Sequence, residues 1–196
     1  MTARWPADPS HIAHAADRLR AGAVIAFPTD TLYGVGARAA DPAAVARLYQ
    51  LKRRPATQPM VWLVSDRDQA EVFAVVSPAA GELMARYWPG PLTLVLPARV
   101  RNDASTIAVR APDHDVALDL LRALGEPIAS SSANPAGQSP PVDADQVMAA
   151  LGDELDGVLD GGQCAIGQPS TILDLTGPAP RILRQGAIPP SDLIRG

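Results

Sequence analysis

The sequence predicts an α/β fold in which a mixed β-sheet is flanked by helices. Short apolar runs typical of strands alternate with amphipathic stretches typical of helices over the first two-thirds of the chain. Toward the carboxyl end, strand-like runs follow one another with little helix between them, so we expect both parallel and antiparallel neighbours. The chain length suits one domain with a sizeable core, and we expect a single domain over residues 1–196.

The predicted helices begin at residues that suit a helix N-terminus. Ser10 is expected to cap the first helix, which stops at Gly22, and Asp113 to cap a later helix that Gly125 closes. The other predicted helices start with Asp41 and Pro42, with Ser77 and Pro78, and with Asp143. Apolar residues of the first helix fall on one face, as packing against a sheet requires.

Apolar runs bounded by turn-forming residues are predicted as strands. They cover residues 23–27, 60–65, 92–97, 106–110, 127–134, 170–175 and 181–186. Several of these runs end in hydroxyl or basic side chains. Because ligands sit beyond the carboxyl ends of strands in open α/β sheets, these ends are candidate binding positions.

The composition argues against several classes of protein. A formal net charge of −4 and a pI near 5.3 do not fit a surface that grips nucleic acid over its whole extent. Cys164 is the only cysteine, so the chain has no internal disulfide and no cysteine-based metal cluster. No segment resembles a signal peptide or approaches the ~20 apolar residues of a membrane span. We therefore expect a cytoplasmic protein that does not associate with a membrane.

The most informative segment is FPTDTLYGVG, residues 27–36, which follows a run with the pattern of a buried strand. Thr29, Asp30, Thr31 and Tyr33 place hydrogen-bonding groups directly after that strand, at the edge where α/β sheets bind ligands. We call residues 28–33 the cradle. A cation cluster, KRRP, comes next along the chain. A polar turn followed by positive charge suggests a small anionic ligand.

Each polar or basic cluster also has a simpler interpretation. The cations of residues 52–54 would complement a helix dipole if a helix ends there, or they bind phosphate. SSSANPAG, residues 130–137, is either a polar turn or a set of donors for a carboxylate or phosphate. Arg110 is either a salt-bridge partner or the anchor of a ligand carboxylate. Ser170 and Arg184 again place a hydroxyl and a cation at strand ends near the carboxyl end. We therefore predict one shared pocket for an anionic ligand.

Several well-known site patterns are missing or incomplete. The P-loop pattern GxxxxGK[ST] does not occur. Gly34, Gly36 and Ala39 fit a GxGxxA spacing, but polar residues separate Gly34 from the strand, and no acidic residue follows at the usual distance. A dinucleotide site is therefore not supported. Neither a zinc site nor a Ser–His hydrolase is supported by the histidines, which are His11, His14 and His114.

Taken together, the motifs resemble those of the threonylcarbamoyl-AMP synthases, the YrdC/Sua5 family. In order they are PTDTLYGVG, KRRPATQP, WPGPLT, IAVRAP, SSSANPAG, PSTILDL and RILRQGAI. The resemblance runs from about residue 12 to residue 189 and implies a twisted mixed sheet around a concave basic cleft. It implies synthesis of threonylcarbamoyl-AMP from L-threonine, bicarbonate and ATP with release of diphosphate, a nucleotidyl transfer. Partner proteins of such enzymes move the threonylcarbamoyl group to the adenosine beside the anticodon of tRNAs.

The resemblance also implies roles for particular residues. The L-threonine subsite would contain Thr31, Arg110, Ser132 and Ser170. The ATP phosphates would be held by Lys52 and Arg54, which stabilise charge and do not act as nucleophiles. The nucleotide would also contact Gln58, Thr106, Asn134 and Arg184. Some members carry a histidine in the threonine subsite where this chain has Leu63, and the chain resembles the short, single-domain members.

The implied chemistry suits these side chains. A carbamate of threonine attacks the α-phosphate of ATP, so two anions must meet, and positioning with charge neutralisation helps such a step more than a protein nucleophile does. Mg²⁺ is expected to enter with ATP, since it often uses few protein ligands. Asp30 is the one carboxylate of the cradle. It is a candidate for a metal or water contact, or else a turn former that bonds its own backbone.

Two other functions stay open on the sequence alone. An RNA-binding or ribosome-assembly module would use a basic cleft for backbone phosphates, even weakly, although the net acidity and few aromatic residues count against it. The other is a relative that uses carbamoyl phosphate, because the same domain type occurs in hydrogenase-maturation carbamoyltransferases. Those enzymes carry zinc-finger cysteines that this chain lacks.

Overall fold

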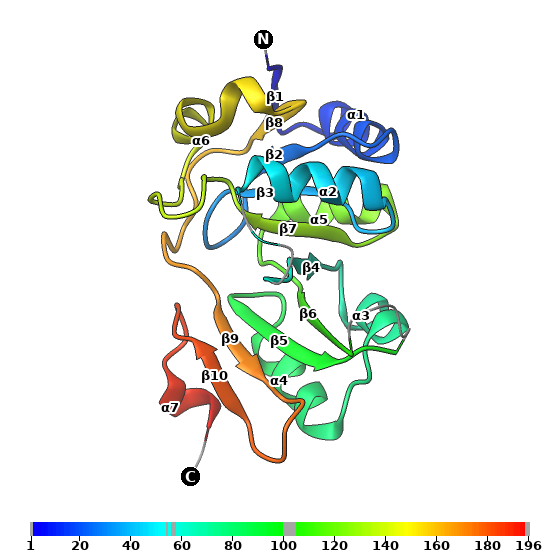
Figure 1. Cartoon of the computed structure of the whole chain (residues 1–196), viewed down its shortest axis with the longest axis vertical. Helices are drawn as coiled ribbons and strands as arrows, with labels where there is room; N and C mark the ends of the chain where they lie inside the picture. Colours follow the sequence, from blue (N-terminus) through cyan, green and yellow to red (C-terminus); the bar gives the residue numbers. More distant parts are fainter. Residues whose placement is uncertain (1, 54, 56–57, 100–104, 195–196) are drawn as a thin grey trace.

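A computed structural model describes residues 2–53, 55, 58–99 and 105–194 (Figure 1). Within these residues the strands form one sheet in the order β1-β8-β2-β3-β7-β4-β6-β5-β9-β10. Their bounds are β1 Arg4–Pro6, β2 Ile25–Phe27, β3 Gly34–Arg38, β4 Val61–Leu63, β5 Leu92–Pro97, β6 Thr106–Arg110, β7 Ile128–Ser132, β8 Gly157–Asp160, β9 Thr171–Asp174 and β10 Arg181–Arg184. β2 pairs with β8 in parallel and with β3 antiparallel, so the predicted mixed α/β fold is confirmed.

The helices largely follow the capping residues that predict them. They are α1 Pro9–Arg20, α2 Pro42–Leu51, α3 Arg67–Phe73, α4 Pro78–Tyr87, α5 Asp115–Leu124, α6 Ala144–Leu151 and α7 Pro190–Leu193, with a 3₁₀ turn at Gly152–Glu154. The carboxylate of Asp41, the hydroxyl of Ser77 and the carboxylate of Asp143 accept main-chain N–H groups at three of the starts, as expected.

Two predicted caps are wrong. The cap of α1 is Asp8, whose carboxylate accepts the main-chain N–H of His11, because Pro9 already occupies the first helical position. The hydroxyl of Ser10 donates to that carboxylate instead. The cap of α5 is His114, one residue after the predicted Asp113, and its side chain makes no capping hydrogen bond.

The sequence patterns did not predict β1, β3, β8, α3 and α7. The most consequential of these is β3, because it follows the cradle directly. Glycine is depleted in strands, so a GVG stretch reads as a turn. In the sheet, however, Gly36 lies so close to Ile128 of β7 that a Cβ atom would come within 2.4 Å of that side chain. Because Gly34 and Gly36 have no Cβ atom, side chains of the neighbouring strands, Ser130 and Ile128 of β7 and Phe27 of β2, occupy the space beside them.

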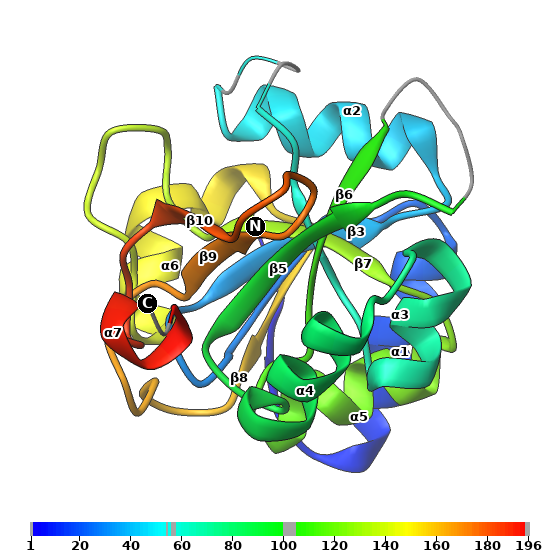
Figure 2. The ribbon, with the colours of Figure 1, turned by 90° about the horizontal axis from the view of Figure 1, so that it is seen from below.

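The sheet has two differently covered halves, visible in Figure 1. The upper half-sheet (β1, β8, β2, β3 and β7) has helices on both faces: α1 and α5 pack on one and α2 and α6 on the other. The lower half-sheet (β6, β5, β9 and β10) packs one face against α3, α4 and α7, as the view from below shows (Figure 2). Its other face is left uncovered by the described helices, and β4 joins the two halves.

Among the described residues, the helices are too short or too polar for any of them to cross a membrane.

Candidate functional site

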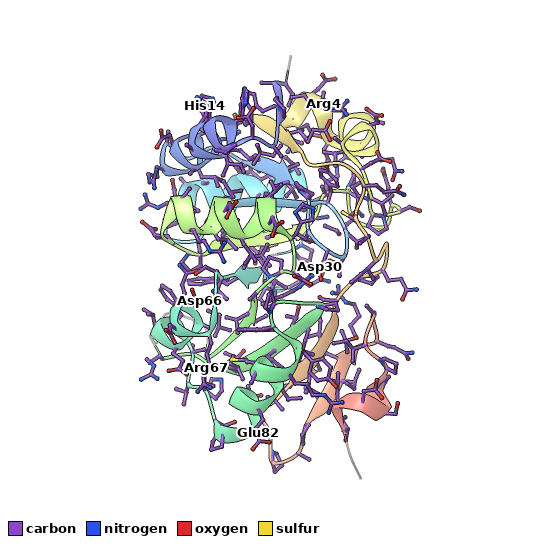
Figure 3. The ribbon with its side chains drawn as sticks, turned by 180° about the vertical axis from the view of Figure 1, so that it is seen from behind. Arg4, His14, Asp30, Asp66, Arg67 and Glu82 are labelled. Carbon is purple, nitrogen blue, oxygen red and sulfur yellow. The ribbon has the colours of Figure 1, made fainter. Side chains whose placement is uncertain are left out.

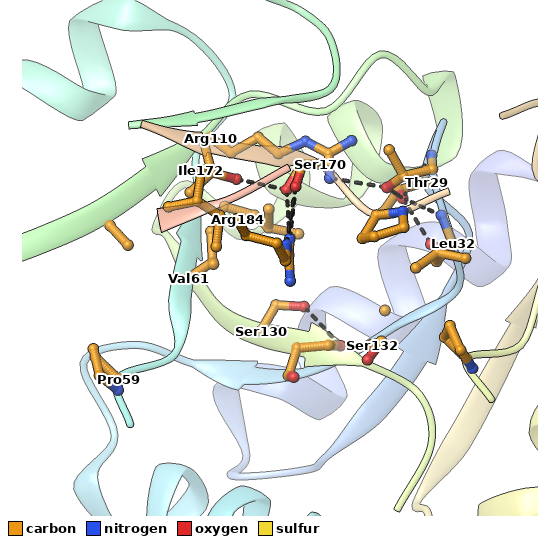
Figure 4. Close-up of a pocket in the computed structure, with 18 of the residues that line it drawn as sticks. Thr29, Leu32, Pro59, Val61, Arg110, Ser130, Ser132, Ser170, Ile172 and Arg184 are labelled. Carbon is orange, nitrogen blue, oxygen red and sulfur yellow. Dashed lines mark hydrogen bonds between the residues drawn. The ribbon is translucent and has the colours of Figure 1, made fainter. Parts of the chain in front are cut away.

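A cavity of about 570 Å³ lies on the uncovered face of the lower half-sheet. The strict alternation of side chains along strands produces it. In β5, Leu92, Leu94 and Leu96 point into the core below, whereas Thr93 and Val95 line the cavity. The cradle and the loop that follows β7 complete the walls (Figure 4).

Arg110 dominates the polar end of the cavity. Its Nε donates to the main-chain carbonyl of Gly90 at 2.9 Å, and its Nη1 donates to the hydroxyl of Thr31 at 2.9 Å. Its Nη2 donates to the carboxylate of Asp30. Three of the five N–H groups of the guanidinium are thereby used, which leaves two for a ligand. A guanidinium held in a fixed plane is suited to bind a carboxylate.

The cradle is ordered by its own hydroxyl group. Thr29 Oγ1 donates to the main-chain carbonyl of Leu32 at 2.7 Å and accepts the main-chain N–H of Thr31 at 3.2 Å. From the other side, the main-chain N–H groups of Ile166 and Gly167 bind the carbonyls of the cradle at 2.9 and 3.0 Å. This turn places the hydroxyl of Thr31 at the guanidinium of Arg110.

A pair of hydroxyl groups lies beside Arg110. The hydroxyls of Thr93 and Ser170 share a hydrogen bond of 2.8 Å, although both residues are buried. Arg184 donates through Nη2 to the hydroxyl of Ser170 at 3.0 Å and also binds its main-chain carbonyl. The polar end therefore presents cations and hydroxyls together, as Figure 4 shows.

The middle of the cavity is apolar. Its wall is formed by Val61, Val95, Ala108, Ile172 and Leu183. Leu183 joins it because the pairing of β9 and β10 shifts register between Ile182 and Arg184, a β-bulge. Two consecutive residues, Leu183 and Arg184, can therefore both face the cavity. An apolar wall of this kind can pack against the aromatic ring of a nucleobase.

Ser130 and Ser132 lie across the cavity from Arg110 (Figure 4). The register explains this separation: Ser130 is opposite Val61, and Val61 is in turn opposite Ala108, two residues before Arg110. Ser132 lies two residues farther away in the same direction. It begins the loop that carries Asn134.

Lys52 lies beneath that loop. The side chain is buried, and its ammonium donates to the main-chain carbonyls of Ser132 and Asn134. The main-chain carbonyl of Lys52 accepts the N–H of Ala136 at 3.2 Å. Lys52, the cap residue at the carboxyl end of α2, thus binds both ends of the loop.

The structure brings most of the sequence-predicted site residues together around this cavity. Those that line it are Thr31, Gln58, Arg110, Ser132, Asn134, Ser170 and Arg184, with Leu63 beside them. Lys52 and Asp30 lie behind the walls, the first under the loop and the second behind Arg110. Thr106 is exposed on the same face of β6 as Arg110, four residues away along the strand. Arg54 lies outside the described residues.

Several residues that line the cavity were given no role from the sequence, among them Thr93 and Gln138. Thr29 was included only as part of the cradle. Thr93 carried a usable signal, since it interrupts the run LTLVLP at a position that alternation places opposite the leucines. Ser130 belongs to a motif that was recognised, but only its neighbour Ser132 was singled out.

The ion pair between Asp30 and Arg110 is the main electrostatic feature of the site. Both side chains are only 6% exposed. Burial lowers the pKa of Arg110, and the charge and hydrogen bond of Asp30 oppose that change. Figure 3 shows Asp30 from behind, near the junction of the two half-sheets.

The described carboxylates do not offer a ready site for Mg²⁺. In the part of the chain that the structure describes, no three His, Cys, Asp or Glu side chains gather as a ligand set. Asp30 is neutralised by Arg110, and a second cation beside it would compete with that guanidinium.

The chain is similar to proteins of one family. The model of the Sua5/YciO/YrdC family, which carries the description "telomere recombination", matches residues 17–186. The chain is 41% identical over 182 residues to the threonylcarbamoyl-AMP synthase of Pyrococcus abyssi, an alignment covering 89% of this chain and 54% of the relative. It is 42% identical over 189 residues to the threonylcarbamoyl-AMP synthase of Bacillus subtilis, covering 92% and 54%. The chain spans about half the length of these two curated relatives.

A solved structure has the same fold. The crystal structure of P. abyssi Sua5 complexed with L-threonine superposes on the chain with a TM-score of 0.91 and 38% sequence identity. The superposition covers 99% of this chain and 61% of that chain.

Proposed function

The chain belongs to the Sua5/YciO/YrdC family, and we propose that it makes threonylcarbamoyl-AMP from L-threonine, bicarbonate and ATP. The observation that carries the proposal is the buried Arg110, fixed at the polar end of a cavity with donors to spare. Support comes from relatives about 40% identical that are named for this synthesis, and from a relative solved with L-threonine. The reaction is a nucleotidyl transfer.

L-Threonine is proposed to bind at the polar end. Its carboxylate would accept hydrogen bonds from Arg110, and its neighbours there would be the hydroxyls of Thr31 and Ser170. Leu63 lines the cavity next to Arg110, because the two residues are register partners in β4 and β6. An apolar side chain at this position can contact the methyl group of threonine.

ATP is proposed to occupy the rest of the cavity. The base would lie against the apolar wall, and the polar groups of Gln58, Asn134 and Arg184 would contact the nucleotide. Ser132 pairs with Gly34, the residue that follows the cradle, and its contact with threonine stays a prediction. Phosphate binding by Lys52 and Arg54, and a nucleotide contact of Thr106, stay predictions. Mg²⁺ would enter as the complex with ATP.

The chemistry needs no protein nucleophile. The amine of threonine forms a bond to the carbon of bicarbonate and water leaves, which gives a carbamate. A carbamate oxygen then attacks the α-phosphorus. The bond from that phosphorus to the β-phosphate oxygen breaks, and diphosphate leaves. Arg110 orients the amino acid through its carboxylate, and cations at the phosphate end reduce repulsion between the two anions. We further propose that the product serves tRNA modification, passed on by partner proteins.

A single assay tests the proposal. Protein is mixed with ATP, bicarbonate and L-threonine, diphosphate release is measured, and each substrate is omitted in turn. We expect release only when both threonine and bicarbonate are present. Release without threonine would overturn the proposed synthesis, and release with carbamoyl phosphate in place of bicarbonate and threonine would favour the carbamoyl-phosphate alternative. The RNA-binding alternative is not favoured, since the curated relatives are named as synthases.

A further inference from the structure

We propose that Asp30 is a positioning residue for L-threonine, which acts by fixing the guanidinium of Arg110. The proposal rests on the proposed function of the cavity. In it, Asp30 does not touch the substrate and acts only through Arg110. Its basis is the set of acceptors around Arg110. Asp30 and Thr31 come from the cradle and Gly90 from the turn before β5, and together they hold three different N–H groups.

Asp30 does not face the cavity. Thr29 and Thr31 on either side of it line the cavity, whereas Asp30 does not, and its side chain is 6% exposed. The turn of the cradle therefore directs the carboxylate to the guanidinium of Arg110 and away from the cavity lining. Its contact with the cavity runs through the guanidinium.

The carboxylate of Asp30 is committed to Arg110. Its Oδ1 accepts from Nη2, and its Oδ2 is buried with no hydrogen-bond partner among the described residues. A charge-assisted hydrogen bond in a buried site is stronger and more directional than one in water. Asp30 therefore restricts the rotation of the guanidinium and compensates its buried charge.

The backbone of the cradle makes this restriction rigid. The carbonyl of Asp30 accepts the N–H of Ile166, and the carbonyl of Thr31 accepts the N–H of Gly167. Asp30 is consequently held by a segment far along the chain. The plane of Arg110 is set by the fold before a ligand arrives, so less ordering is needed on binding.

The test compares Asp30→Asn with the natural chain. Asparagine keeps the size and an acceptor oxygen but loses the charge. We expect the KM and the directly measured Kd for L-threonine to rise roughly tenfold to a hundredfold, the effect of one charged hydrogen bond. The KM for ATP should stay within about threefold, because the nucleotide is proposed to bind elsewhere in the cavity. Asp156→Asn is the matched control, since it breaks an Asp–Arg pair (with Arg47, 3.0 Å) outside the cavity lining.

A double-mutant cycle separates positioning from general damage. In an Arg110→Met background, Asp30→Asn should change the threonine Kd by less than about twofold, because the group through which Asp30 acts is gone. An equal effect in both backgrounds, or equal rises in the KM of both substrates, would overturn the positioning role. If Asp30→Asn does not fold, Asp30→Glu decides: it keeps the charge but displaces the carboxylate, and an unchanged threonine KM would overturn the proposal. Failure of the natural chain to bind threonine would instead overturn the proposed function.

Discussion

Lys52 binds the main-chain carbonyl of Asn134 from beneath, with its side chain only 3% exposed. The same ammonium also donates to the carbonyl of Ser132, so one lysine orders the loop that both cavity residues occupy. Its charge lies at the base of this loop. A cation placed there can favour phosphate in the cavity and can also keep the loop in shape.

Lys52→Met should weaken ATP use and lower stability together. Methionine keeps the aliphatic stem but removes the donor. The carbonyl of Ser132 keeps the N–H of Asn134, whereas the buried carbonyl of Asn134 loses the ammonium, at a cost of about 1–3 kcal/mol. We expect the KM for ATP to rise about tenfold or more, with a smaller change in the KM for threonine. Steady-state kinetics and urea unfolding measure both effects. Arg53→Met removes the same charge from an exposed neighbour, and an equal loss in that control would contradict the assignment.

Gly36→Ala should destabilise the sheet. The added Cβ would lie 2.4 Å from Cγ2 of Ile128 and 3.0 Å from the main-chain oxygen of Ala129, so the strands must shift. Overpacking of this kind costs about 1–3 kcal/mol. Thermal unfolding should show a lower Tm by about 2–4 °C for each kcal/mol.

The control for this prediction is Gly177→Ala, where the nearest atom is 3.8 Å from the added Cβ and no positive φ is involved. It should be neutral or slightly stabilising, because alanine restricts the unfolded chain. Equal Tm changes in the two variants would show that the approach of β3 to β7 is not the reason for the glycine.

Local sequence patterns predicted much of this fold but not its longest-range contacts. The strands at Leu92–Pro97 and Thr106–Arg110 have the predicted bounds, since their apolar runs are flanked by clear turn residues. β3 was not predicted because glycine has a low strand propensity. The reason for Gly36 is the close approach of Ile128 in the neighbouring strand, which the local sequence does not show. The sequence nominated Asp30 and Arg110 separately. Their pairing joins positions 80 residues apart, which no local periodicity can reveal.

Thr93→Val should impair threonine use although Thr93 belongs to the interior of a strand. The hydroxyl of Thr93 orients that of Ser170 through a 2.8 Å bond, and valine has the same shape without the hydroxyl. We expect a loss of about 1 kcal/mol in stability and a several-fold higher KM for threonine. Thr93→Ser keeps the hydroxyl and should restore the KM. A serine variant as impaired as the valine variant would indicate that packing, and not the hydrogen bond, is responsible.

His114 should make the protein less stable in weak acid. Burial lowers the pKa of His114 below its ordinary value, and the charges of Asp30, Asp115 and Asp113 oppose that change in part. Because the folded pKa lies below the unfolded value of about 6.5, folding favours the neutral ring. The resulting stability is present above pH ~6.5 and is lost as the pH falls through the folded pKa.

His114→Asn tests this linkage. Asparagine is neutral throughout and is favoured at a helix N-cap, the position of His114 at the start of α5. Between pH 7.5 and pH 5, we expect the free energy of unfolding to fall less in the variant than in the natural chain. Urea unfolding at both values measures the difference, with His11→Asn as the control, since His11 lies on the surface beside Asp8. Because carboxylates titrate in both proteins, only the difference between the two slopes reports on His114. Parallel slopes would mean that its ring gains a proton as readily in the folded chain as in the unfolded one.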